Sequence, residues 1–125
     1  MKQTETTDLS KKIRELILQR EQRYYEKDLN DKYDAYFDAK DWDNALLQTI
    51  LMENYVIPKY GKESGEYATI LYKKGMLFKT ATCVDDKIEA LGLLIESKKL
   101  YEQLGLKYSE CWKCCTKGIN ELIGN

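Results

Sequence analysis

Three cysteines near the C-terminal end are the residues whose types and spacing come nearest to a chemical site. Cys111, Cys114 and Cys115 stand at positions i, i+3 and i+4, so one face of a helix would present them together. A zinc ion takes about four ligands, and the fourth would have to come from Cys83 in a distant loop. We therefore expect small buried side chains on a core helix and no metal site. A metal- or redox-responsive protein is the alternative.

Other groups that catalysis commonly uses are missing. The sequence contains no histidine, which removes the commonest general base and a common zinc ligand. It shows no glycine-rich phosphate loop and no convincing pair of nucleophile and base. We expect no enzyme activity from this chain by itself, and no cofactor.

The net charge and the hydropathy of the sequence argue against two classes of partner, nucleic acids and membranes. The formal net charge is -1, whereas a duplex-binding domain carries a strong positive excess that displaces counterions from phosphates. No run approaches the roughly 18 to 20 apolar residues of a membrane span. Residues 1–10 lack the apolar core of a signal peptide. We expect a protein of the cytoplasm or the nucleus that binds neither nucleic acid nor membrane.

Apolar residues recur with a helical period along the chain, and no segment has a convincing strand pattern. We predict a single all-α domain of about six helices, stacked as antiparallel pairs over residues 8–39, 41–81 and 85–123. The first helix carries one apolar stripe made of Leu9, Ile13, Leu16, Ile17 and Tyr24.

Helix ends are predicted from capping and breaking residues. Asp8, Asp85 and Ser109 are expected to be N-caps. Pro58 is expected to end the third helix and Gly105 the fifth. No glycine or proline separates the first two predicted helices, so the sequence leaves open whether they are continuous.

Small residues inside the helices indicate close packing. Gly75 costs helix stability, roughly 1 kcal/mol relative to alanine, so a close approach of another helix is the best reason for it. Ala45 and Ala90 belong to two similar segments, 40–46 and 84–91, which both combine a polar turn, acidic residues and an Ala-Leu pair. Their offset is somewhat longer than the tetratricopeptide repeat of about 34 residues.

Several of these residues also resemble a known family. Segments 41–46, 71–78 and 89–91, with Tyr55 and Tyr60, are similar to the C-terminal helical domain of the SET- and MYND-domain lysine methyltransferases, the SMYD family. The resemblance covers roughly residues 29 to 105 and implies tetratricopeptide-like helix pairs. It also implies a non-catalytic role, because the motifs of the SET domain and the zinc ligands of the MYND finger are not in this sequence.

A protein-interaction module is therefore the predicted function. In the SMYD family this domain helps to wall the substrate cleft and offers a surface to partners, so the resemblance implies a catalytic domain of the same gene or a chaperone tail as the partner. In tetratricopeptide repeats the first helix of each pair lines a concave groove, and by analogy the second, fourth and sixth predicted helices are expected to line it here. The residues expected to face a bound peptide are Thr69, Tyr72, Lys73, Met76 and Lys79.

Charges near that groove leave the chemistry of the peptide open. Lys73, Lys74 and Lys79 would suit an acidic tail, because converging cations bind a terminal carboxylate strongly. The aspartates of segment 28–38 would repel such a tail and attract a basic peptide. A solvated helix face accounts for either set of charges, and a structural oligomerisation bundle is a further alternative to peptide binding.

Overall fold

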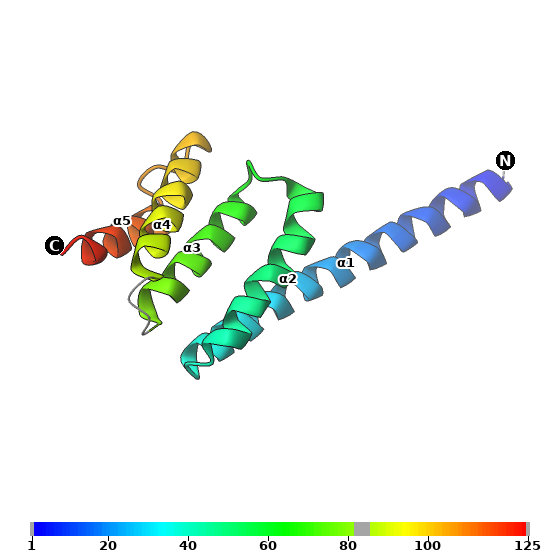
Figure 1. The fold of residues 1–125 in the computed structure, drawn as a ribbon. Coiled ribbons are helices and arrows are strands. Elements are labelled where there is room, and N and C mark those ends of the chain that lie inside the picture. Colours follow the sequence, from blue (N-terminus) through cyan, green and yellow to red (C-terminus); the bar gives the residue numbers. More distant parts are fainter. Residues whose placement is uncertain (1, 82–85, 125) are drawn as a thin grey trace.

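The computed structural model describes residues 2–81 and 86–124. These residues form five α-helices (Figure 1): α1 (Lys2–Asp38), α2 (Trp42–Tyr60), α3 (Gly65–Thr80), α4 (Asp86–Gln103) and α5 (Glu110–Leu122). The described ranges contain no strand, which confirms the all-α prediction. None of the described helices has the length and apolar character needed to cross a lipid bilayer.

Residues 2–81 and 86–124 form five helices where about six were predicted, because the first two predicted helices are one. α1 runs without a break from Lys2 to Asp38, so Asp8 lies inside it and is not an N-cap. Two ion pairs at i, i+4 spacing, Lys27–Asp31 at 2.8 Å and Asp28–Lys32 at 3.0 Å, span the point where a break was considered. Such pairs stabilise a helix locally, and no residue there interrupts it.

Three helices begin at side chains that accept a hydrogen bond from the backbone N–H three residues further on. Asp41 caps α2, Ser64 caps α3 and Ser109 caps α5. Each satisfies a backbone donor that has no partner within the helix. The prediction for Ser109 is confirmed, whereas the cap predicted at Asp85 lies outside the described residues.

Glycines with positive φ, and not the proline, follow the ends of α2 and α4. α2 continues through Pro58 to Tyr60 and ends at Gly61, which has φ of 83° and donates its N–H to the Ile57 carbonyl at 3.0 Å. Pro58 therefore removes one hydrogen bond from the last turn without ending the helix, contrary to the prediction. Gly105 follows α4 with φ of 77°, as predicted.

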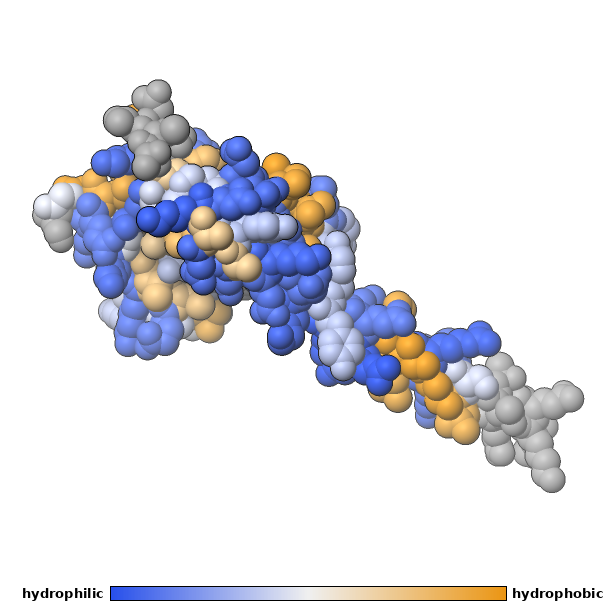
Figure 2. Space-filling model, turned by 90° about the horizontal axis from the view of Figure 1, so that it is seen from below, coloured by the Kyte–Doolittle hydropathy of each residue, from blue (hydrophilic) through white to orange (hydrophobic). Residues whose placement is uncertain are grey.

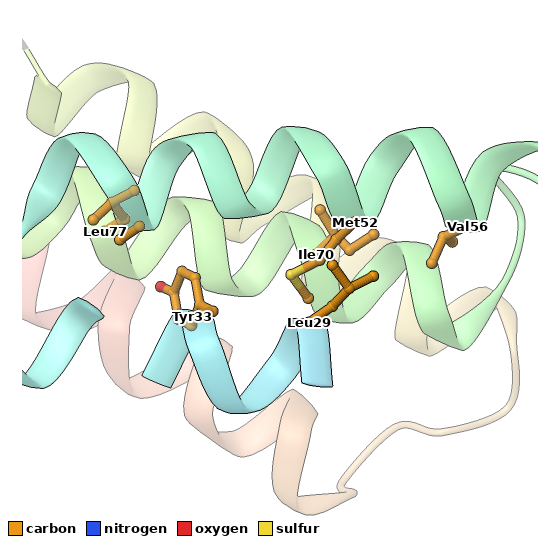
Figure 3. Packing of buried hydrophobic residues seen from close by; sticks show 7 residues of the cluster. Leu29, Tyr33, Met52, Val56, Ile70 and Leu77 are labelled. Carbon is orange, nitrogen blue, oxygen red and sulfur yellow. The ribbon is translucent and has the colours of Figure 1, made fainter. Parts of the chain in front are cut away.

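α3 lies between two groups of helices and contributes to both parts of the core. Figure 3 shows side chains of α1, α2 and α3 meeting in the first part. The buried residues of this part are Leu29, Tyr33, Ala45, Met52, Val56, Ile70 and Leu77. The second part joins α3 to α4 and α5 through Ala68, Leu71, Leu100, Tyr101 and Cys115. Because both sides of α3 are covered, this helix is apolar on more than one side.

Small residues allow the close approaches between helices. Ala45 and Ala90 are completely buried. A Cβ added at Gly75 would lie 2.8 Å from Cγ of Leu94, closer than two carbon atoms can pack. The prediction that these three positions lie in helix contacts is confirmed.

The N-terminal part of α1 projects away from the other helices (Figure 1). We call residues 8–24 the arm. Its apolar stripe is exposed to between 47% and 65%, and hydrophobic residues are visible along the projection in Figure 2. The stripe consists of Leu9, Ile13, Leu16, Ile17 and Tyr24. At 3.6 residues per turn it points roughly opposite to the core residues Leu29 and Tyr33, so no described helix covers it.

Contacts with the end of α2 hold the base of the arm. The rings of Tyr25 and Tyr55 pack edge to face with centroids 5.0 Å apart. Lys59 places its ammonium 3.2 Å from the carboxylate of Glu26, which also accepts a hydrogen bond from Tyr60. Partial burial raises the pKa of Glu26, but the hydrogen bonds from Tyr60 and Lys59 outweigh it and lower this pKa overall.

Candidate peptide-binding groove

Two neighbouring hollows lie over α3. The first, between α1 and α3, has a volume of about 340 Å³ and is lined by Tyr33, Asp34, Phe37, Asp38, Tyr72, Lys73 and Met76. The second, between α3 and α5, has a volume of about 200 Å³ and is lined by Tyr72, Met76, Cys114, Lys117, Gly118 and Glu121. Because Tyr72 and Met76 line both, the hollows form one surface, which we call the groove.

Alternate helices supply the walls of the groove. α1, α3 and α5 line it, and these helices contain the second, fourth and sixth predicted helices. Of the five residues predicted to face a peptide, Tyr72, Lys73 and Met76 line the groove. Lys79 is bound at its edge, 2.5 Å from the Glu121 carboxylate.

Thr69 is the predicted residue that the structure does not bring into the groove. It lines a different hollow, of about 190 Å³, among α1, α2 and α3. Its hydroxyl is 2.8 Å from the Tyr101 hydroxyl and 2.9 Å from the Gly65 carbonyl oxygen. Thr69 therefore joins α3 to α4 and is not free to bind a peptide in the groove.

The three lysines considered as a carboxylate clamp do not converge. Lys73 lies 3.3 Å from Asp34 of α1, while Lys74 pairs with Glu53 of α2 on another side of α3. Lys79 pairs with a carboxylate of α5. Since each ammonium has its own carboxylate, the structure does not form a shared site for an acidic tail.

Tyr33 and Phe37 of α1 are groove residues that the sequence analysis did not single out. Their rings are stacked with centroids 5.9 Å apart. The Tyr33 hydroxyl donates a hydrogen bond to the Lys73 carbonyl at 2.5 Å, which ties α1 to α3. Burial raises the pKa of Tyr33, so the hydroxyl keeps its proton. The signal in the sequence was an aromatic pair at i, i+4 beside Asp34 and Asp38, a carboxylate pair with the same spacing.

Tyr72 stands at the middle of the groove and remains neutral at physiological pH. Burial, with a smaller contribution from the neighbouring Cys114, raises the pKa of Tyr72 to about 12. Its hydroxyl is therefore a hydrogen-bond donor as well as an acceptor, and its ring offers apolar area to a ligand.

The cysteines do not share one environment. Cys115 is fully buried, with its sulfur 3.4 Å from the Ser97 hydroxyl, and burial raises the pKa of its thiol. Cys111 and Cys114 are exposed, so the prediction of buried side chains is wrong for these two. Both lie in the first turns of α5, outside the side of that helix on which Cys115 and Gly118 are buried. Cys83 lies outside the described residues, and the described ones contain no group of three or more histidine, cysteine or acidic side chains placed to hold a metal.

No known protein family matches the chain, and neither a curated protein nor a solved structure matches it.

Proposed function

We propose that this chain is a protein-interaction module whose groove holds a segment of another protein. The observation that carries the proposal is the joining of two hollows across α3, with walls supplied by three alternate helices. Stacked helix pairs of the tetratricopeptide type place their binding surface in this way. The likeness to the SMYD C-terminal domain and the absence of catalysis remain parts of the proposal.

The dimensions of the groove favour an elongated ligand. The first hollow, at about 340 Å³, is at the lower end of the range for small-molecule pockets, and the second is smaller still. Each has room for a side chain or two. A peptide that crosses α3 between Tyr72 and Met76 fills both, whereas a compact molecule fills one.

Replacing Tyr72 with alanine is expected to weaken peptide binding about tenfold or more, because the ring is shared by both hollows. The ligands are peptides selected from a random display library on the wild-type chain, and fluorescence polarisation measures their affinities. Lys73→Glu is expected to alter the affinities as well, because it reverses a charge inside the first hollow. An acidic peptide should then bind more weakly and a basic peptide more tightly.

Tyr108→Ala is the matched control, since Tyr108 is an exposed tyrosine that lines neither hollow of the groove and lies outside the arm. It should leave the affinities unchanged, and circular dichroism should show all three variants folded. The proposal fails if the selection yields no peptide, or if Tyr72→Ala binds every selected peptide as tightly as the wild type does.

A second candidate function follows from the exposed stripe of the arm. Helices in proteins take most of their stability from packing of an apolar face, and contiguous exposed apolar surface marks an interaction site. We propose that two copies of the chain pair through their arms. Arg20 interrupts the stripe between Ile17 and Tyr24, and its aliphatic stem can still cover apolar surface.

Replacing both Ile13 and Leu16 with glutamate is expected to convert a dimer into a monomer in sedimentation velocity, because two charges would enter the paired stripe. Leu18→Glu is the control, because Leu18 is equally exposed but points away from the stripe. A wild-type chain that stays monomeric at high concentration would rule out pairing through the arm and leave the groove unaffected.

A further inference from the structure

The first hollow of the groove has walls of an unusual composition. Three aromatic side chains surround it, Tyr33 and Phe37 from α1 and Tyr72 from α3. Two carboxylates, Asp34 and Asp38, stand on the α1 side. Aromatic faces and carboxylates are the two kinds of group that attract an ammonium or guanidinium ion.

A lysine of the chain itself already uses this chemistry. The Lys73 ammonium lies 4.7 Å from the centroid of the Tyr33 ring and 3.3 Å from a carboxylate oxygen of Asp34. The Lys73 side chain is 15% exposed, while that of Asp34 is 63% exposed. The carboxylate therefore keeps most of its acceptor sites open to an incoming donor, because an ionised carboxylate accepts about four hydrogen bonds.

Charges in the hollow do not balance. Asp34 and Asp38 face a single cation, Lys73, so the hollow carries one negative charge in excess. The second hollow has Lys117 and Glu121, and Glu121 is also paired with Lys79. A ligand of complementary charge would therefore place a cation at the α1 end of the groove. At the α5 end, the lysines already balance the charge of Glu121.

We propose that the hollow between α1 and α3 takes a lysine or arginine side chain of the bound segment, with the cation between the Asp34 and Asp38 carboxylates and its stem against the rings of Phe37 and Tyr72. The inference rests on the proposed function of the groove and names the chemistry of the partner: a basic peptide. An acidic tail is the partner that this hollow disfavours.

The test uses the peptides selected from a random library that lose affinity for Tyr72→Ala. In each, every lysine or arginine is replaced in turn by norleucine, which keeps an apolar stem and removes the charge. One such replacement per peptide is expected to weaken binding about tenfold, with other positions much less sensitive. Peptides that bind equally well without any basic residue would overturn the inference while leaving the peptide-binding groove in place. A selection without peptides would overturn both.

Substitutions in the chain test where the basic side chain of the peptide binds. Asp38→Asn removes a charge with little change of shape and is expected to weaken the selected basic peptides severalfold. Asp28→Asn is the matched control, because Asp28 belongs to the same helix but pairs with Lys32 outside the groove. The difference between these two variants should shrink when norleucine replaces the sensitive residue, and it should also shrink at high salt. Equal effects of the two substitutions, or a difference that persists with norleucine, would contradict a cation in this hollow.

Discussion

Gly75→Leu is expected to lower the free energy of unfolding by about 3 kcal/mol, the upper end of the usual cost of overpacking a core. Its Cβ alone would meet Leu94 at 2.8 and 2.9 Å and the Ala90 carbonyl oxygen at 3.4 Å. Leu94 is fully buried and also approaches Gly118 on α5, so a shift of its side chain disturbs the packing of α4 on both neighbouring helices. Urea denaturation followed by circular dichroism measures the change.

The chain offers a matched control in Gly92, which lies in α4 with nothing within 4 Å of an added Cβ. Gly92→Ala should raise the free energy of unfolding by about 0.5 to 1 kcal/mol, because alanine is the better helix former. A Gly75→Leu variant as stable as the wild type would show that α3 and α4 do not approach each other as closely as described.

Leu94→Ala is expected to cost about 2 to 5 kcal/mol, because it removes a completely buried side chain and leaves a cavity. Leu94 fills the space between Gly75 and Gly118, so its loss affects the contacts of α4 with both α3 and α5. The neighbouring Ile95 is 37% exposed, and Ile95→Ala should cost markedly less. Equal costs at the two positions would show that α4 is turned differently about its axis.

The two sites are also expected to be coupled. In the Leu94→Ala background, Gly75→Ala has room for its methyl group, so the double variant should be more stable than the sum of the two single effects predicts. Strict additivity in urea denaturation would mean that the two side chains are not in contact.

Close packing between helices was predictable from the sequence because it places a poor helix-forming residue within a helix. A glycine in an apolar helix costs stability, and only a neighbouring helix gives a reason for it, as at Gly75. Serine before a polar first turn likewise predicted the start of α5 at Ser109. The absence of a terminator between the first two predicted helices was the signal for one long helix, but absence alone did not decide between one helix and two.

Groove residues were only partly predictable, because a groove depends on how helices cross. Tyr72 and Met76 followed from the period of α3 and the analogy with helix pairs. Thr69 has a similar place in the period but meets Tyr101 of α4, a partner 32 residues away. Tyr33 and Phe37 were visible as an apolar pair, yet nothing local indicated that part of their surface borders a hollow.

Ion pairs were likewise predictable within a helix but not between helices. Ion pairs within α1, such as Lys27–Asp31, follow from i, i+4 spacing. The pair of Lys73 with Asp34 joins two helices, and a lysine with several carboxylates in reach gives no local sign of which one it takes. For this reason the sequence left acidic and basic peptides equally open, and the proposal of a basic peptide depends on contacts between helices.

α1 also fixes the distance between the two proposed binding surfaces, the groove and the apolar stripe of the arm. At 3.6 residues per turn, Asp34 and Asp38 lie on the same side of this helix as the apolar stripe that ends at Tyr24. Ten residues separate Tyr24 from Asp34, which amounts to about 15 Å along a continuous helix. If both proposals hold, a second copy paired through the arm brings its own groove, and a partner with two basic segments would bind such a dimer more tightly than a partner with one.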